Sequence, residues 1–516
     1  MPASAASSLG IVQANLIPPQ RQRICTGRTA TGRRGVSETA SPAASREPLT
    51  PDICVIGDSP GGLAVATAAA LFGVRTVLVR QSGSALPLNE GARGQALRAV
   101  AQRARAIADA EPFGVAAGAC EIDYGRVRAH LDQVSARSAV SDSDERLAAL
   151  GVLVLKGEAR FQNRRQIVVG ESVIKARRFV VATGSLPALP DIAGLAELPS
   201  LTEDSIFELP KRPERLIVLG GTAAAVELAQ AMRALGSEVA LIARDGLLLD
   251  EDPEAVGVLR RALLGDGITL HEGRPILRAE SHRQRPRVVL DGDTKIDGTH
   301  LLVANGRRPN IAGLELDLAG VRSDGTGIIV DASLRAANRS IYAVGDCVGG
   351  VAAGPISSQA AQHQAGLVLR NALFRQPTRF RREWVPRTVH GWPELASIGL
   401  TEAQARALGE IRVLRFPYAE STRAQAERPA EGLIKLMTDR KGGILGVVIA
   451  GAQAAELIMP WGLAVQKRMN VREMAGLIAP SRSLSELSQK AALSFQAPLA
   501  AKPGIRRLIG FLSRFG

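Results

Sequence analysis

The stretch DICVIGDSPGGLAVATAAALFGVRTVLVR, residues 52–80, decides the fold of this chain. An apolar run at 53–56 predicts a buried strand, which leads into a turn rich in glycine. An Ala-rich segment then predicts a helix, Gly73 ends it, and residues 76–79 predict a second strand. This order of strand, glycine-rich turn, helix and strand is typical of the βαβ unit that binds dinucleotides.

Two positions in this unit depart from the usual pattern. Gly57, Ser59 and Gly62 occupy the three positions at which glycines let the backbone and the helix N-terminus approach a pyrophosphate. The middle position holds serine, and the second strand ends in Arg80 where an acidic residue usually holds a ribose hydroxyl. The alternative interpretation is an α/β protein whose first turn binds nothing.

A second βαβ unit is predicted at residues 215–244, RLIVLGGTAAAVELAQAMRALGSEVALIAR. Gly220, Thr222 and Ala225 occupy its three fingerprint positions, so the middle glycine is again replaced. Its second strand ends in Arg244 with no acid there, which favours a 2′-phosphate and hence NADP over NAD. A solvated surface role for Arg244 is the alternative.

Two further strand ends carry candidate ligand-binding residues. In RFVVATGSLP a buried strand at 179–182 is followed by Thr183 and Gly184, and in SIYAVGDCV a strand runs into Gly345 and Asp346. Ligands of α/β proteins bind at the carboxyl ends of strands, so both places are candidate cofactor contacts.

The rest of the chain predicts a three-domain protein. Helices are expected after residue 81 up to 108, at 123–150 and at 357–374, and strands at 152–154 and 166–169. Residues 393–495 change to an α+β pattern, with strands at 411–416, 432–437 and 444–450 and helices at 401–408, 454–468 and 484–493.

Composition limits the possible functions. The net charge is +14, but the basic residues are scattered and aromatic residues make up only 3% of the chain, so we expect no nucleic-acid binding. The four cysteines lie far apart, which predicts reduced thiols and a cytoplasmic location. No metal motif and no membrane-spanning run is present in the sequence.

The two ends of the chain differ from its body. Residues 1–48 are poor in acids and predict a disordered tail, with a targeting-like peptide or an over-extended start as alternatives. Residues 503–516 place apolar side chains at helical spacing among arginines. Such a basic amphipathic helix either contacts an anionic membrane surface or docks on the protein body.

Taken together, two dinucleotide folds, an ATG strand, a GD strand and a C-terminal α+β domain resemble the pyridine nucleotide-disulfide oxidoreductases. Within this family the chain is most similar to the branch of mercuric reductase and dihydrolipoamide dehydrogenase, through VSDSDERLAALGV, DEDPEAVGVLRRAL and WPELASIGLTEAQAR. The resemblance implies FAD in the first fold, NADP or NAD in the second, and a homodimer. It implies an FAD-binding domain at 49–190 and 314–380, an NAD(P)-binding domain at 191–313, a dimerisation domain at 381–497 and a basic tail at 498–516.

The resemblance also assigns roles to the candidate residues. Gly57, Ser59, Gly62, Thr183, Gly184, Gly345 and Asp346 would contact FAD, and Gly220, Thr222, Ala225 and Arg244 would contact NAD(P). Glu227 matches a carboxylate that the family places near the nicotinamide and the flavin; a helix-surface acid is the alternative.

The chain departs from the family at the redox centre. In PLNEGA, Pro87 and Ala92 stand at the two positions of the redox cysteines, and no lysine follows. Ser481 stands at the position of the catalytic histidine. Because neither proline nor alanine can attack a disulfide, and serine cannot act as an acid-base group near neutral pH, we expect no disulfide, lipoamide or mercuric-ion reduction by the family mechanism.

Two hypotheses of different class follow. The first is an FAD-dependent NAD(P)H oxidoreductase that passes electrons from reduced flavin to a small-molecule or quinone-like acceptor, because hydride transfer between cofactors needs none of the missing groups. The second is a catalytically silent family member that acts as a dimeric binding or scaffold protein.

Overall fold

The structure, a computed structural model, describes residues 47–80, 88–118, 120–354, 356–428, 430–497 and 503–515. The predicted N-terminal tail therefore lies outside the described residues except for its last two positions. The first described pairing is a bridge between Leu49 and Ile174.

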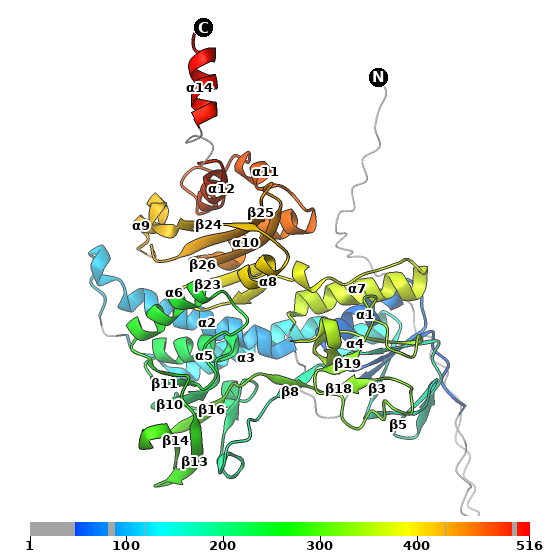
Figure 1. Ribbon diagram of the computed structural model, residues 1–516. Coiled ribbons are helices and arrows are strands. Elements are labelled where there is room, and N and C mark those ends of the chain that lie inside the picture. Colours follow the sequence, from blue (N-terminus) through cyan, green and yellow to red (C-terminus); the bar gives the residue numbers. More distant parts are fainter. Residues whose placement is uncertain are drawn as a thin grey trace, which may run out of the picture. The chain divides into compact units, whose positions relative to one another are not determined.

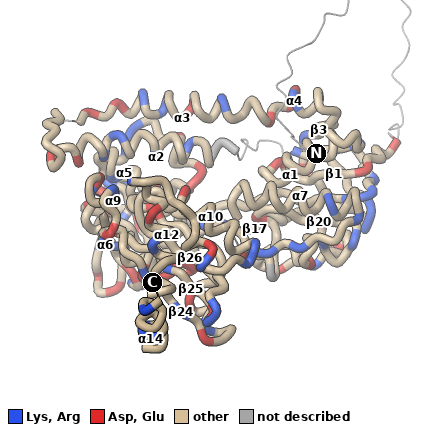
Figure 2. Tube along the Cα trace, turned by 90° about the horizontal axis from the view of Figure 1, so that it is seen from above, with Lys and Arg blue, Asp and Glu red and all other residues tan. Residues whose placement is uncertain are grey.

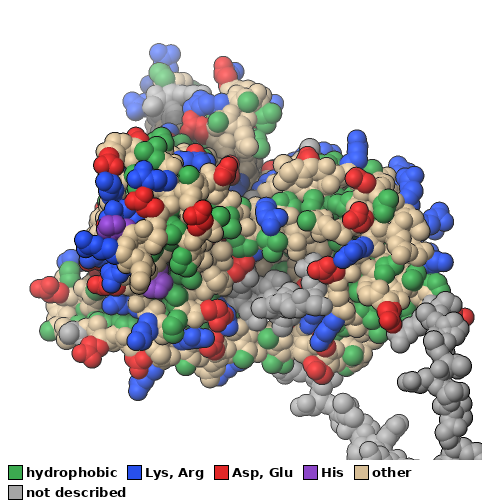
Figure 3. All heavy atoms as spheres, turned by 90° about the horizontal axis from the view of Figure 1, so that it is seen from below, with side chains coloured by type: hydrophobic (Ala, Val, Ile, Leu, Met, Phe, Trp, Pro, Cys, Tyr) green, Lys and Arg blue, Asp and Glu red, His purple; other side chains and the backbone are tan. Residues whose placement is uncertain are grey.

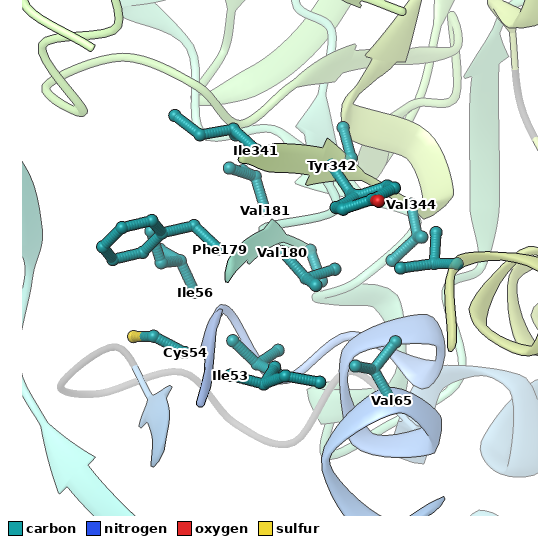
Figure 4. Packing of buried hydrophobic residues seen from close by; sticks show 14 of the residues in the cluster. Ile53, Cys54, Ile56, Val65, Phe179, Val180, Val181, Ile341, Tyr342 and Val344 are labelled. Carbon is teal, nitrogen blue, oxygen red and sulfur yellow. The ribbon is translucent and has the colours of Figure 1, made fainter. Parts of the chain in front are cut away.

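The first sheet is the parallel sheet that residues 52–80 predict. Its five strands are β1 (Ile53–Ile56), β2 (Thr76–Arg80), β3 (Val152–Lys156), β7 (Arg178–Val181) and β20 (Ile341–Ala343), in the order β20-β7-β1-β2-β3. Helices α1 (Pro60–Leu71) and α7 (Ser358–Phe374) pack together beside this sheet. Figure 1 labels β3 of this sheet and the helices α1 and α7. Figure 4 shows how side chains of β1, β7 and β20 pack in its core, among them Ile53, Phe179 and Ile341, each at most 1% exposed.

The second sheet follows the same plan. Its strands β9 (Leu201–Thr202), β10 (Arg215–Leu219), β11 (Glu238–Ala243), β12 (Thr269–Glu272) and β16 (His300–Val303) are all parallel, in the order β12-β11-β10-β16-β9. Helix α5 (Ala223–Ala234) joins β10 to β11, and α6 (Pro253–Gly265) joins β11 to β12. The predicted βαβ unit at 215–244 is confirmed.

The C-terminal sheet is antiparallel. Its order is β22 (Arg387–Val389), β23 (Glu394–Gly399), β26 (Ile444–Gly451), β25 (Leu433–Asp439) and β24 (Ile411–Pro417). Helices α8 (Glu402–Ala407), α9 (Thr422–Ala426), α10 (Ala454–Gln466), α11 (Val471–Ala475) and α12 (Ser485–Leu493) accompany it. The three predicted strands are confirmed, and β22 and β23 are additional strands that the alternation of polar and apolar residues did not indicate.

Short strands form four smaller sheets. They are β4 (Ala159–Asn163), β5 (Gln166–Val169) and β6 (Ser172–Ile174); β13 (Ile276–His282), β14 (Arg285–Leu290) and β15 (Lys295–Asp297); β8 (Ser185–Pro187) with β17 (Arg307–Pro309); and β18 (Ser323–Asp324), β19 (Gly327–Ile329) and β21 (Val348–Gly349). The β8–β17 pair links the first fold to the second and contributes to the functional site.

Helices α2 (Leu88–Ala108) and α3 (Tyr124–Ala139) lie side by side (Figure 2). Their buried residues Leu97 and Leu131 share one hydrophobic core with Phe207 and Leu228 of the second fold. The prediction of a single helix at 123–150 is wrong, because α3 ends at residue 139 and α4 (Asp144–Ala149) starts anew. Ser143 is extended and its hydroxyl accepts a hydrogen bond from Arg146 N, so it caps a new helix instead of continuing the old one.

A buried ion cluster joins the second fold to the C-terminal sheet. Lys435 on β25 is 2% exposed, and its Nζ lies 2.6 Å from Asp252 Oδ2, 2.7 Å from Glu254 Oε1 and 2.7 Å from Glu402 Oε2. Asp252 and Glu254 stand at the start of α6, where Asp252 also caps the helix. Lys435 therefore joins carboxylates of two other segments, of which Glu254 also pairs with Arg415 and Glu402 with Arg406.

The last described helix, α14 (Pro503–Leu512), carries basic and no acidic residues, as Figure 2 shows. Its apolar residues Leu508, Ile509, Leu512 and the following Phe515 are 54–75% exposed. Among the described residues, no helix is long and apolar enough to cross a membrane.

Candidate functional site

The first glycine-rich turn has the geometry of a dinucleotide turn. Gly57 has φ +100°, and a Cβ there would lie 2.4 Å from Ala182 O. A Cβ on Gly62 would lie 2.4 Å from Gly57 O, so the helix can pack on the strand only without a side chain. Ser59 precedes the helix and is 8% exposed, and its side chain makes no capping hydrogen bond. The N-terminus of α1 therefore keeps its backbone N–H groups for a ligand.

Three segments meet at this turn. The Ser59 Oγ lies 3.7 Å from the place that a Cβ would take on Gly345, and a Cβ on Gly184 would lie 3.8 Å from Ser59 Cβ. Gly345 N donates a 2.8 Å hydrogen bond to the fully buried Gln364 side chain. Within the described residues, Ser59 Oγ and Gln364 Nε2 are buried and have no hydrogen-bond partner. Buried polar atoms normally have a partner, so these two point to a polar ligand.

The structure brings the predicted residues Thr183, Gly184, Gly345 and Asp346 to the same edge of the first sheet. Asn310 holds the turn after β7, since its backbone N donates to Gly184 O at 3.0 Å and its amide nitrogen donates to Thr183 O at 3.4 Å. Gly184 and Gly345 have φ +67° and +80°, which favour glycine.

The end of β2 carries Arg80, where a dinucleotide-binding strand usually ends in an acidic residue. Arg80 is 8% exposed and turns back onto its own fold, with Nη1 2.7 Å from Asp144 Oδ1 and Nε 3.2 Å from Asp58 Oδ2. Its Nη2 also donates to Asp142 O at 3.1 Å. The positive charge at the end of β2 is thus paired within the protein.

A chain of hydrogen bonds leads from Asp346 to the second fold. Asp346 Oδ2 accepts from Ser185 Oγ at 2.7 Å, and Ser185 Oγ accepts from Arg307 Nε at 2.9 Å. The other end of the guanidinium is 2.7 Å from Asp204 Oδ1. Ser185 on β8 and Arg307 on β17 are close because these two strands pair.

The second glycine-rich turn is tighter than the first. A Cβ on Gly220, which has φ +134°, would lie 2.1 Å from Ala304 O. Thr222 stands at the replaced glycine position, where its hydroxyl accepts from Ala225 N at 3.2 Å and donates to Ala304 O at 2.9 Å. The threonine thus caps α5. Arg244 follows β11; it is about half exposed, and its Nη2 lies 2.9 Å from Asp245 Oδ2.

A cavity of about 200 Å³ lies between α2 and α5. Glu227 on α5 lines it and is partly buried, and its Oε1 accepts a 2.8 Å hydrogen bond from His390 N. Burial raises the pKa of Glu227, while the His390 backbone hydrogen bond opposes the rise. Burial also raises the pKa of Glu203 to about 7; Arg307 opposes that rise, and Asp204 and Glu227 add to it.

Three positions of this chain correspond to the redox groups that the family resemblance predicts. Pro87 lies outside the described residues, Ala92 is partly buried on α2, and Ser481 is exposed. Glu486 accepts a hydrogen bond from Arg482 N, so this carboxylate stabilises its own loop.

Cys54 and Cys347 are buried free thiols, and burial raises the pKa of Cys347 to about 11. In the part of the chain that the structure describes, no group of three or more His, Cys, Asp or Glu residues could hold a metal ion.

Glu203, Asp204 and Arg307 are the site residues that the sequence reasoning missed. Two features of the sequence could have indicated them: the acid pair that directly follows a short strand, and the GRRPN segment. The two features are brought together only by the pairing of β8 with β17.

Two parallel dinucleotide folds and an antiparallel C-terminal sheet define a two-nucleotide oxidoreductase architecture. Residues 51–365 match the sequence model of "Pyridine nucleotide-disulphide oxidoreductase", and residues 385–492 match its dimerisation domain, which suggests a homodimer. The chain belongs to the pyridine nucleotide-disulphide oxidoreductase family, whose members bind FAD and NAD(P)H.

Individual relatives agree with this assignment. The chain is 34% identical over 465 residues to a dihydrolipoyl dehydrogenase of Thermus scotoductus, covering 86% of this chain and 97% of that protein. It is 35% identical over 352 residues to a mercuric reductase of Bacillus cereus, covering 67% of this chain but only 55% of that protein. A solved structure of LpdA from Mycobacterium tuberculosis is 24% identical with a TM-score of 0.75, over 86% of this chain and 99% of that one. The flavoprotein disulfide reductase RclA from Escherichia coli is 22% identical, also with a TM-score of 0.75 over 86% and 99%, and these two structures support the fold alone.

Proposed function

We propose that this protein is an FAD-dependent NAD(P)H oxidoreductase that transfers electrons to a small-molecule acceptor without a redox disulfide. The observation that carries the proposal is the first turn, where a free helix N-terminus and the unpartnered Ser59 and Gln364 atoms surround the approach that Gly57 and Gly62 leave open. These groups fit an anionic pyrophosphate. When bound, FAD would supply a two-electron carrier between NAD(P)H and the acceptor.

Each residue of the site has a task in this proposal. Gly57, Ser59 and Gly62 hold the pyrophosphate, Thr183, Gly184 and Gly345 shape the approach, and Asp346 accepts hydrogen bonds from ribityl hydroxyls. Gly220, Thr222 and Ala225 present the N-terminus of α5 to NAD(P)H, and the exposed Arg244 favours NADPH over NADH by its charge. Glu227 lines the space between the two folds. The domain boundaries at residues 190, 313 and 380 and a cytoplasmic homodimer are parts of the same proposal.

The test is an absorption spectrum of the purified full-length protein before and after anaerobic addition of NADPH. The proposal expects flavin bands that bleach. A colourless protein that takes up no added FAD would refute it and favour the alternative of a dimeric binding protein.

A variant sharpens this test. Ser59→Ala removes one hydroxyl donor to a charged pyrophosphate, which costs ~1.5–3 kcal/mol and so weakens FAD binding by about tenfold or more. Ser494→Ala is the matched control, because that hydroxyl donates to Ala491 O in the C-terminal domain. Equal FAD affinity in both variants would contradict the role of Ser59.

We also propose that α14 contacts an anionic membrane surface. Its exposed apolar residues Leu508, Ile509 and Leu512 lie at helical spacing, and the helix carries Arg506 and Arg507 and no acidic residue. The full chain should sediment with vesicles that contain phosphatidylglycerol and not with neutral phosphatidylcholine vesicles. Leu508→Glu together with Leu512→Glu should abolish sedimentation, and persistence in this double variant would refute the proposal.

A further inference from the structure

A second cavity, of about 590 Å³, lies in the first fold at the amino ends of its parallel strands. Arg178, which lines it, is the first residue of β7, and Ser340, which also lines it, directly precedes β20. The proposed flavin contacts Gly184 and Gly345 follow the carboxyl ends of the same two strands, which pair in parallel. The cavity is therefore separate from the proposed cofactor site.

The wall of this cavity is held in place by Asn338. Its amide nitrogen donates to Arg164 O at 2.9 Å, in the turn between β4 and β5, and its Oδ1 accepts from Ser340 Oγ at 2.7 Å. The turn that carries Arg165 is thus tied to the residue that precedes β20. A ligand would meet side chains on segments that are already fixed to one another.

The charge around the cavity has a single sign. None of its eight lining residues is acidic, and four are basic: Arg165, Lys175, Arg177 and Arg178. Arg177 has a carboxylate partner, since its Nη1 lies 3.2 Å from Asp52 Oδ1. Across the described residues, no ion pair involves the other three. On the face shown in Figure 3, by contrast, basic and acidic side chains are mostly interspersed.

Arg178 also carries a buried donor that lacks an acceptor. Its Nη1 donates to Arg177 O at 3.0 Å, and its guanidinium approaches the Tyr342 hydroxyl, so both neighbours are neutral. Its Nε is buried and has no hydrogen-bond partner within the described part of the chain. Buried polar atoms normally have a partner, and a phosphate oxygen is the acceptor that the guanidinium fork fits best.

The lining indicates the class of ligand. A volume of about 590 Å³ is in the range of small-molecule sites and exceeds the need of a single phosphate group. Ala176 is the one apolar residue among the lining residues, and no aromatic residue lines the cavity. An apolar compound would therefore find no wall to pack on, and nucleic-acid bases would find no side chain to stack on.

We propose that this cavity binds a small compound with at least two phosphate groups, held by Arg165, Lys175 and Arg178. The inference goes beyond the proposed function and does not depend on it, because none of these residues belongs to the flavin or NAD(P) turns. Binding is reversible and electrostatic, so it weakens as the ionic strength rises.

The test is calorimetric titration of inorganic tripolyphosphate into the full-length protein at low ionic strength, with FAD and NADP⁺ in excess to occupy the dinucleotide turns. Arg165→Gln and Arg178→Gln should each weaken binding by at least about tenfold, because each removes charge-assisted hydrogen bonds. The matched control is Arg137→Gln, which removes the same charge from an exposed position on α3 and should weaken binding by less than about twofold.

Arg165 is exposed in its turn, so its variant keeps the test valid if Arg178→Gln does not fold. Equal tripolyphosphate affinities of the wild-type protein and Arg165→Gln would overturn the inference. So would an equal loss in Arg137→Gln, which would point to net charge instead of this cavity.

Two competing ligands complete the test. Citrate, which is trivalent but has no phosphate, should bind more weakly than tripolyphosphate, and equal binding would overturn the phosphate class. A short DNA duplex that binds more tightly than tripolyphosphate and is lost in Arg165→Gln would overturn a small ligand in favour of nucleic acid. None of these outcomes changes the flavin spectrum, which tests the proposed function separately.

Discussion

Replacing Lys435 by methionine should destabilise the protein strongly. Methionine keeps the apolar stem of the side chain but removes an ammonium group that is 2% exposed and lies within 2.7 Å of three carboxylates. Breaking a buried ion pair by removing one partner costs about 3–5 kcal/mol, because the remaining charge stays buried without compensation. Asp252 is as buried as Lys435, so we expect the loss to fall in this range.

The assay is urea unfolding followed by tryptophan fluorescence, since Trp461 is fully buried beside the C-terminal sheet. Arg423→Met is the control, because Arg423 pairs with Glu427 one helical turn away at a partly exposed site and should contribute less than about 0.5 kcal/mol. A loss below about 1 kcal/mol, or one equal to that of the control, would refute the reasoning.

Three further predictions follow from the same structure. Gly220→Ala should weaken NAD(P)H binding by at least about tenfold and leave the FAD content unchanged, because the added Cβ would lie 2.1 Å from Ala304 O. Equal NADPH titrations of the variant and the wild-type protein would contradict this prediction. Arg244→Ala should weaken NADPH binding by ~1 kcal/mol and leave NADH binding unchanged, as measured by fluorescence titration, since its guanidinium is about half exposed and pairs only with its neighbour Asp245 in the described contacts. In the wild-type protein, hydrogen bonds from Arg415 and then from Lys435 lower the pKa of Glu254 to about 2. The ionised Glu254 therefore contributes its full stabilisation above about pH 4.5, and this contribution is lost as the pH falls towards 2. Unfolding midpoints measured across this pH range would detect the loss.

The sequence was sufficient for those parts of the fold in which the pattern is local. The strand at 53–56 and the βαβ unit at 215–244 follow from apolar runs and glycine positions, and both are confirmed. The break of the helix at 123–150 is also local, because Ser143 followed by Asp144 and Glu145 is a capping signal, but the continuous apolar spacing concealed it.

The candidate site was only partly predictable. Glycine positions are visible in a sequence, because the glycine-rich turn between a strand and a helix is recognised from its local spacing. The partners of Arg80 and of Arg307 are not visible, since Asp144 is 64 residues away from the first and Asp204 is 103 residues away from the second. Burial from both folds also sets the pKa of Glu203, so no spacing rule could have indicated it.

Ser185 occupies a position that connects the proposed flavin site to the cavity between α2 and α5 by hydrogen bonds. Its single hydroxyl donates to Asp346 and accepts from Arg307, which lines the cavity between α2 and α5. A ligand that takes over the Asp346 carboxylate changes the partners of this hydroxyl and hence those of Arg307. Because such linkage is reciprocal, any factor by which a ligand in the cavity changed the affinity for the flavin would equal the factor by which the flavin changed the affinity for that ligand.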